Sequence, residues 1–233
     1  MEKQLKEIDT WTTIRKELND NYNLSEQWKS AVELFDKRIN KKYLNSIEEL
    51  IAKDIREGEG FLIVTIQCVL IELFAAFKDG AIYNHNKPIE GGLYYEYKDC
   101  GEIFIKFLNT EDIFNKIFFV TDKLGNKQLN TPFSGKLFYS QVRCGLMHEA
   151  RTKGNWHINA TKNDNISDTR FIKQAKKGNV IYRTLLHFAL TRYFKKYKSE
   201  LLNEDIVYNN LRRLFARKLD DLYDIKDDSE WWT

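Results

Sequence analysis

The sequence predicts an all-α fold, and three observations lead to this prediction. Only two prolines occur among 233 residues, and proline is the residue that a helix interior tolerates least. Aromatic residues make up 14% of the chain, and helices accommodate them. Apolar residues also recur three and four positions apart along most of the chain. A chain of this length can bury a substantial core, so we expect one helical domain over residues 1–233.

Three helices are expected near the amino terminus. Residues 2–19 carry an apolar stripe at helical spacing. A second helix is expected from a Ser25 cap to about Ile39. A third is expected over residues 47–55, with Ser46 as its cap.

Residues 61–77 form the longest apolar run and contain no turn residue. This pattern favours a helix that is buried nearly all round, at the centre of a bundle. The run is too short for a membrane span, and Gln67 and Glu72 interrupt it. A buried carboxylate requires a partner. Glu72 is therefore expected either at the water-facing rim of the bundle or paired with a cation such as Arg143.

The longest expected loop covers residues 78–101, where glycines, asparagines and a proline gather. Its tyrosines, within residues 94–97, either stack on nucleobases or pack back over the core. The helical pattern returns over residues 103–108 and 113–120, and residues 123–126 should form a turn.

A further helix is expected to start at Pro132 or Ser134 and to end near Ala150. Residues 156–159 should be extended. From Asp168 the pattern again indicates a helix, whose core face comprises Phe171, Ile172, Val180, Leu185, Leu186, Ala189, Leu190 and Phe194.

The last expected helix covers residues 204–223. Beyond it, Trp231 and Trp232 should either dock on the protein or serve as an interaction handle.

The cysteines and histidines argue against several classes of site. The three cysteines, Cys68, Cys100 and Cys144, are scattered without a CxxC pair, which indicates free thiols and a reducing cytoplasm. The four histidines lack ligand-like spacing, so neither a metal nor another cofactor is expected. The charged amino terminus is unlike a secretory signal. No phosphate-binding loop, GxGxxG or GxSxG motif occurs.

The candidate catalytic residues lie together near the end of the helix expected to reach Ala150. Arg143 offers a planar fork of donors that suits phosphate oxygens. His148 can transfer protons in both directions near pH 7. Glu149 is a candidate to orient either of them, and His157 is a candidate second imidazole. Together these residues suit cleavage of RNA without a metal.

Helix geometry restricts this hypothesis. Five positions place Arg143 and His148 about 140° apart on a regular helix. They can converge only if the helix unwinds after Gly145 or if a second protomer completes the site. The alternative interpretation puts Arg143 in a surface ion pair and leaves His148 as a helix-terminal residue that bonds to nearby carbonyls.

The string from Val142 to Ala150, late in a helical chain, resembles the HEPN superfamily. The motif of that family is an arginine, four to six residues and then a histidine, at the end of a bundle helix. Arg143 and His148 match these two positions with four residues between them. The apolar helix that contains residues 66–72 is similar to the core helix that precedes the motif. The resemblance covers roughly residues 45–200, with extra helices at both ends.

This resemblance implies a metal-independent endoribonuclease that acts as a homodimer on single-stranded RNA or RNA loops. It also implies a toxin or antiviral defence effector, restrained by a regulatory or antitoxin protein. Many active members carry Asn, Asp or His directly after the arginine, whereas this chain has Cys144. The alternative is a catalytically inactive helical module that binds RNA or a partner protein.

Positive charge follows the motif. Between Asp168 and Lys198 there are nine basic residues and one acidic residue. A basic face of this kind suits a phosphate backbone, although a solvated helix face gives the same pattern. The expected RNA-binding residues are Lys173, Lys176, Lys177 and Arg183.

Overall fold

The computed structural model describes residues 2–53, 58–88, 93–130, 133–160, 170–225 and 231–232. Helix accounts for 66% and strand for 11% of the structure, so the mostly helical character predicted from the sequence is confirmed. Of the expected boundaries, Pro132 and Asp168 lie outside the described residues. The helices are α1 (Glu2–Asp20), α2 (Ser25–Ile39), η1 (Asn40–Leu44), α3 (Asn45–Lys53), α4 (Glu59–Asp79), α5 (Cys100–Thr110), α6 (Asp112–Phe118), α7 (Gly135–Leu137), η2 (Phe138–Arg143), α8 (Cys144–Glu149), α9 (Arg183–Leu201), η3 (Ile206–Tyr208) and α10 (Asn209–Leu222).

The chain forms two compact units that alternate along the sequence. Unit 1 comprises residues 1–42, 74–98 and 194–233, and unit 2 comprises residues 43–73 and 99–193. Helices α4 and α9 each contribute residues to both units.

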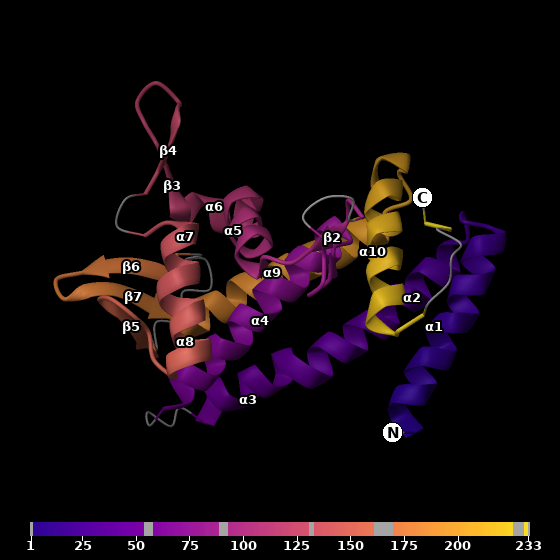
Figure 1. Cartoon of the computed structure of the whole chain (residues 1–233), viewed down its shortest axis with the longest axis horizontal. Coiled ribbons are helices and arrows are strands. Elements are labelled where there is room, and N and C mark those ends of the chain that lie inside the picture. The colour runs from indigo at the N-terminus through magenta and orange to yellow at the C-terminus, as the bar shows by residue number, and fades with distance from the viewer. Residues whose placement is uncertain are drawn as a thin grey trace. The chain divides into compact units, whose positions relative to one another are not determined.

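The core of unit 1 is aromatic. Phe35 of α2 lies 4.2 Å from Phe77 and 5.5 Å from Phe215 of α10, measured between ring centroids. Phe74 and Phe194 stack at 5.4 Å. Helix α1 runs beside α2 (Figure 1). Because large apolar rings dominate the stability of such cores, these contacts hold the ends of the chain together.

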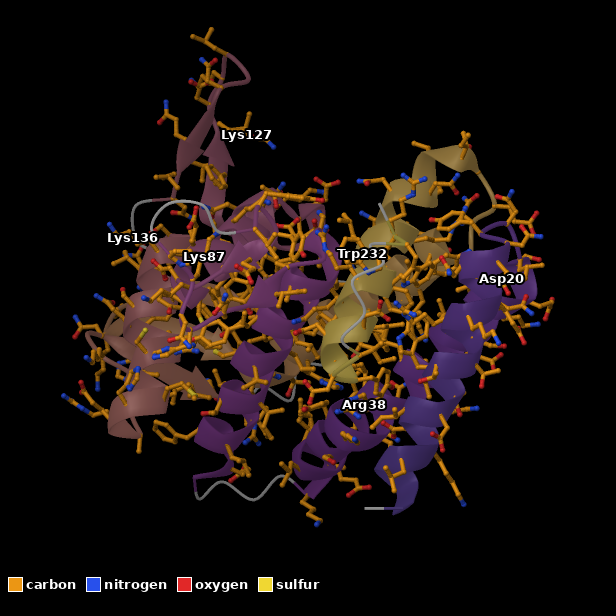
Figure 2. The ribbon with its side chains drawn as sticks, turned by 45° about the vertical axis from the view of Figure 1, so that its right-hand side comes forward. Asp20, Arg38, Lys87, Lys127, Lys136 and Trp232 are labelled. Carbon is orange, nitrogen blue, oxygen red and sulfur yellow. The ribbon has the colours of Figure 1, made fainter. Side chains whose placement is uncertain are left out.

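Asp220 on α10 anchors both termini of unit 1. Its carboxylate accepts hydrogen bonds from the indole nitrogens of Trp11, Trp231 and Trp232, at 2.8, 2.9 and 3.2 Å, and it pairs with Arg15 at 3.1 Å. Figure 2 shows Trp232 beside α10. Of the two roles expected for the tryptophans, the structure therefore shows docking.

The segment expected to be one long loop contains a short parallel pair of strands, β1 (Ile82–Tyr83) and β2 (Glu96–Tyr97). Tyr95 packs edge-on against Trp232 at 5.6 Å, and the Arg217 guanidinium lies 4.5 Å from its ring. Tyr95 therefore packs back over the protein, which was one of the two expectations for these tyrosines.

Unit 2 combines helices with a three-stranded sheet, β5 (Trp156–Asn159), β7 (Gly178–Tyr182) and β6 (Ile172–Ala175), in that order. Strand β7 is parallel to β5 and antiparallel to β6. Figure 1 shows the sheet beside the column formed by α7, η2 and α8. The rings of Phe104, Phe118 and Phe171 surround that of Phe138 on η2 at 6.2–6.3 Å.

Strands β6 and β7 correct the expectation of a helix from Asp168 onward. The helix α9 begins only at Arg183. Phe171 and Ile172 are buried as expected, but they belong to an extended segment that turns back at Lys176 and Lys177, just before Gly178, whose φ is +134°. The β-branched pair Val180–Ile181 fits the pleated surface of a strand. The extended piece expected at residues 156–159 is confirmed as β5.

A second correction concerns residues 113–120, where the helix ends at Phe118. Strand β3 (Phe119–Thr121) then pairs with β4 (Lys127–Leu129) in an antiparallel hairpin. The expected turn at residues 123–126 is present and is organised by Asp122, which accepts bonds from the backbone nitrogens of Leu124 and Asn126. The hairpin projects from unit 2, with Lys127 on its outer part (Figures 1 and 2).

Two expected helix caps were wrong. Ser25 is the first helical residue of α2, and Leu24 occupies the cap position without a side-chain bond. Ser46 lies within α3, because α2 continues through the π-helical turns of η1 into α3 without a break. Buried Leu44 carries the apolar stripe through that junction. Ser134 is confirmed as a cap, since its hydroxyl accepts from Leu137 N at 3.2 Å.

Helix α4 contains the predicted central run. Among the described helices, α4 is the one that is long and apolar enough to cross a membrane. Of its most apolar 18 residues, 56% are buried inside the protein. Gln67 lies on the buried side, where its amide donates to Arg183 O at 2.7 Å. A core helix of this composition satisfies the same test.

Candidate functional site

Arg143 ends the π-helical segment η2, and neighbouring residues hold its side chain in place. Ser134 caps the start of this column, while Phe138 and Val142 anchor one side of η2 in the core. On the opposite side, Nη2 of Arg143 donates to Oε2 of Glu72 at 3.0 Å, and the guanidinium lies 5.5 Å from the ring of Tyr139. The wide turns of η2 thus direct the guanidinium toward α4.

The Arg143–Glu72 pair is largely enclosed, with side-chain exposures of 17% and 21%. Burial works against the charge of Arg143, but the hydrogen bond and the negative charge of Glu72 outweigh it and raise the pKa of the guanidinium. Glu72 therefore has the partner that the sequence suggested as one of two possibilities, and Arg143 is a permanent cation held in one orientation.

All three cysteines gather around this ion pair, which the sequence analysis did not anticipate. Burial raises the pKa of Cys68 to about 12, with Arg143, Glu72 and Cys144 as charged neighbours. Burial and a hydrogen bond to Glu72 raise the pKa of Cys100 to about 11. Since only a thiolate is a good nucleophile, neither Cys68 nor Cys100 is set up as one.

Tyr139 belongs to the same cluster. Burial and, to a smaller extent, a hydrogen bond with Cys144 raise the pKa of its hydroxyl to about 12, although the positive charge of Arg143 opposes the rise. One signal of the cluster was present in the sequence. Cys68 precedes Glu72 by four positions, and residues four apart on a helix share a face.

His148 lies on α8 and is exposed to solvent. The helix does not unwind after Gly145: it continues to Glu149 and ends at Ala150, whose φ of +54° is left-handed. The side chains of Arg143 and His148 therefore leave the helix about 140° apart. Arg143 faces Glu72, whereas His148 has no hydrogen bond or ion pair with any described residue. A single chain does not bring the two candidates together.

Glu149 is engaged elsewhere. Its carboxylate pairs with Lys153 at 2.6 Å and with Arg151 at 3.4 Å, and the hydrogen bond from Lys153 is the main cause of its lowered pKa. Both partners follow it in the chain. It thus contacts neither Arg143 nor His148 among the pairs that the structure records.

Of the four expected RNA-binding residues, one is buried and three lie on the sheet or in its turn. Arg183 is only 3% exposed and pairs with Glu59 at 2.7 Å, so it is held inside unit 2. Lys176 and Lys177 are exposed in the turn between β6 and β7. On β6, the ammonium of Lys173 lies 5.3 Å from the ring of Tyr182.

His157 lies near this lysine turn. It is exposed on β5, and its Nε2 is 3.3 Å from the carbonyl oxygen of Lys177. Gln141 of η2 connects the sheet to the motif helix, because its carbonyl accepts from Lys153 N at 2.7 Å and its Oε1 accepts from Trp156 Nε1 at 2.7 Å. His157 and the lysines thus share one sheet, and Glu72 and Arg143 form a separate cluster.

Within the ranges that the structure describes, no group of three or more His, Cys, Asp or Glu side chains is placed to hold a metal ion. A cavity of about 240 Å³ in unit 2 is lined by Glu59, Phe61, Ile158 and Arg183. Of the candidate site residues, Arg183 is the one that lines it, and its guanidinium is paired there with Glu59.

No protein-family model, no curated protein and no solved structure matches this chain.

Proposed function

We propose that the protein is a metal-independent endoribonuclease that cleaves single-stranded RNA or RNA loops as a homodimer, with Arg143 and His148 as its catalytic residues. One observation carries the proposal. Glu72 and Tyr139 hold the guanidinium of Arg143, and the helix that carries Arg143 ends with His148, whose imidazole is exposed and has no hydrogen bond or ion pair with a described residue. A positioned guanidinium and a solvent-accessible histidine are the two groups that this reaction needs.

The chemistry follows from these two groups. His148 Nε2 or Nδ1, when neutral, accepts the proton of a ribose 2′-hydroxyl, and the resulting oxygen attacks the adjacent phosphorus. The bond from phosphorus to the 5′-oxygen breaks, and that oxygen receives a proton from an imidazolium or from water. The products are a 2′,3′-cyclic phosphate and a 5′-hydroxyl. Arg143 stabilises the negative charge that builds on the phosphate in the transition state.

Arg143 retains donors for this role. A guanidinium has five N–H donors, and the bond from Nη2 to Glu72 is the one recorded for Arg143 with a described residue. Glu72 thus orients the side chain and leaves most of its donors for a phosphate that reaches the partly exposed edge.

The homodimer follows from the divergence of the two side chains. Because Arg143 and His148 leave one helix about 140° apart, a substrate phosphate contacts both only if a second copy supplies one of them. Met147, next to His148, is 48% exposed. In the same unit, Phe61 is 43% and Leu62 is 51% exposed. Exposed apolar side chains of this size suit a protein interface.

The activity test uses the purified chain, a labelled RNA and excess EDTA. We expect cleavage products with 2′,3′-cyclic phosphate ends, and we expect His148→Ala to reduce the rate by at least about 100-fold. His157→Ala is the matched control, since it also removes an exposed imidazole, and it should leave the rate within about twofold. Equal cleavage by the wild type and His148→Ala would show that another group, or a contaminant, does the chemistry.

A mixing experiment tests the shared site. Arg143→Ala and His148→Ala are each inactive alone under the proposal. When the two are unfolded together and refolded, about half of the dimers are mixed, and each mixed dimer has one site with both residues intact. Roughly a quarter of the wild-type activity should return. No recovery, with dimers confirmed by sedimentation, would contradict a site that combines Arg143 of one copy with His148 of the other.

The second candidate function is a catalytically inactive module that binds RNA or a partner protein. The divergence of Arg143 and His148 within one chain favours it, together with the exposed turn of Lys176 and Lys177. This candidate is supported if RNA binds at low salt without being cleaved, with an affinity that falls as salt rises. Lys176→Gln combined with Lys177→Gln should then weaken binding and lower the salt slope by about two.

The toxin or defence setting, the regulatory protein partner and the cytoplasmic location remain predictions that rest on the resemblance and on the thiols.

A further inference from the structure

A cavity of about 410 Å³ lies in unit 1, and no residue of the proposed ribonuclease site lines it. Its walls come from the start of α2, from the end of α9 and from the segment that leads into α10. The volume falls in the range of small-molecule sites. Aromatic and aliphatic side chains line it together with Asn23, Ser25 and Asn209, and its charged members are Glu204 and Arg212.

Arg212 is a buried cation with neutral partners. Its side chain is 7% exposed, and its guanidinium donates to Asn203 O at 2.5 Å, to Leu201 O at 3.4 Å and to Asn209 Oδ1 at 2.6 Å. It forms no ion pair with any residue that the structure describes. A buried charge without a counter-charge is costly, so an anion in this cavity would be stabilised.

Two more groups lie close to Arg212: Tyr22, which lines the cavity, and Arg213, which contacts Tyr22 but is not one of the lining residues. The Tyr22 hydroxyl donates to Asn209 O at 2.7 Å, and the Arg213 guanidinium lies 5.5 Å from the Tyr22 ring. Burial raises the pKa of Tyr22, and the positive charges of Arg212 and Arg213 oppose that rise. Both guanidiniums therefore act on one hydroxyl, and Arg213 likewise forms no ion pair with a described residue.

The rest of the cavity is suited to a flat ring. Trp28 and Tyr22 meet edge to face at 5.2 Å, and the indole nitrogen of Trp28 donates to Tyr22 O at 2.9 Å, which holds both rings in place. Leu201 is buried, and Ile206 is 79% exposed at the rim. Rigid aromatic walls next to a cationic end favour a ligand that joins a ring to an anion.

We propose that this cavity binds a nucleoside monophosphate, with the phosphate at Arg212 and Arg213 and the base against Trp28 and Tyr22. A carboxylate is satisfied by one guanidinium fork, whereas two neighbouring guanidiniums offer more donors than one carboxylate accepts, which suits the three terminal oxygens of a phosphate monoester. Glu204, the acidic residue of the lining, adds repulsion that limits the negative charge of the ligand. This site does not depend on the proposed ribonuclease activity.

The test is calorimetric titration of the whole chain with AMP at low salt. Inorganic phosphate, adenosine and benzoate serve as parallel probes for the phosphate, the base and a simple carboxylate. We expect saturable binding of AMP, at one site per chain, that is at least tenfold tighter than binding of each other probe. Equal affinity for AMP and inorganic phosphate would overturn the role of the ring, and no binding of AMP would overturn the site.

Variants locate the binding. Arg213→Gln changes an exposed side chain and should weaken AMP binding about tenfold, as expected for the loss of a charged hydrogen bond. Glu204→Gln should strengthen it roughly threefold, because it removes a repulsive charge. Lys195→Gln, an exposed residue of α9 outside the cavity lining, removes the same charge as Arg213→Gln and should change nothing. If Arg213→Gln and Lys195→Gln weaken binding equally, the anion is held by net charge alone and the proposal fails.

The same titration with His148→Ala separates this proposal from the ribonuclease. AMP affinity should be unchanged in that variant, whether or not RNA cleavage is lost.

Discussion

At the residue scale, Glu72 has two neighbours that it affects in different ways. It holds Arg143 through a 3.0 Å hydrogen bond, and it raises the pKa of Cys100 through another. Both effects come from one carboxylate within the mostly apolar middle of helix α4. Loss of its negative charge should therefore change both stability and thiol chemistry.

Replacement of Glu72 by Gln tests the first effect. Gln keeps the shape but removes the counter-charge of a largely enclosed arginine, so the free energy of unfolding should fall by about 1–3 kcal/mol. Urea denaturation measures this change. Glu149→Gln is the control, since its ion pairs are exposed and should leave the unfolding midpoint unchanged. Equal effects of the two substitutions would show that the Arg143–Glu72 pair contributes nothing special.

Thiol alkylation tests the second effect. With a pKa of about 11, Cys100 is almost entirely protonated at pH 8, and iodoacetamide should label it slowly. Its rate should rise about tenfold for each pH unit until the pH nears 11. In Glu72→Gln the burial that mainly raises the pKa of Cys100 remains, but the further contribution of the Glu72 carboxylate is lost, so labelling at pH 8 should be faster. Peptide mass spectrometry separates Cys100 from the other cysteines, and unchanged labelling of Cys100 would contradict the assigned contact.

At the scale of elements, the sheet of unit 2 depends on Gly178. This residue has a φ of +134°, and a Cβ placed there would lie 2.0 Å from Asn155 O. The close approach occurs where β7 starts to pair with β5, because Asn179 N donates to the same carbonyl at 2.7 Å. The backbones therefore meet only if residue 178 lacks a side chain.

Gly178→Ala should destabilise the protein by roughly 3 kcal/mol or more, since it combines backbone strain with a clash that no side chain can relieve. Gly125→Ala is a matched control. Gly125 also has a positive φ, +86°, but a Cβ there would have nothing within 4 Å. It should cost only about 1 kcal/mol. Thermal unfolding followed by circular dichroism measures both, and a smaller effect at Gly178 than at Gly125 would be inconsistent with the sheet as described.

The sequence predicted an element correctly where the pattern that defines the element lies within one segment of the chain. The stripe of α1, the apolar run of α4 and the turn at residues 123–126 each lie within one segment, and each was predicted correctly. Strands β6 and β7 were not, because Phe171, Ile172 and Val180 fit a helical stripe when read alone. Only the pairing of β7 with β5, earlier in the chain, and of β6 with β7 favours the extended form.

The same distinction separates the parts of the candidate site that were predicted from those that were missed. The Arg143–Glu72 pair was one of two expectations, and the sequence could offer it because a buried carboxylate requires a cation. The gathering of three cysteines around that pair depends on how α4, α5 and η2 pack, which no local pattern encodes. The burial of Arg183 was missed for the same reason, since its partner Glu59 lies on another helix.

At the scale of the molecule, Asp220 joins segments from both ends of the chain. Asp220→Ala would leave the indole donors of Trp11 and Trp232 and the cation of Arg15 without their acceptor in a buried setting. The free energy of unfolding should fall by about 3–5 kcal/mol, and the tryptophan fluorescence of the folded protein should shift to the red. Asp221→Asn is the control, because its pair with Lys218 lies within one helix, and it should cost less than about 1 kcal/mol. Equal losses of stability in the two variants would contradict the anchoring role of Asp220.

The order of the units along the chain affects how the protein can be made. Unit 2 is built from residues 43–73 and 99–193, whereas the core of unit 1 needs Phe35 from near the start and Phe215 from near the end. During synthesis, the apolar faces of α1 and α2 therefore stay uncovered by α10 until all of unit 2 has been translated. A ribosome that stalls before α10 would release a chain with those faces uncovered, and such a chain is a natural substrate for chaperones and proteases.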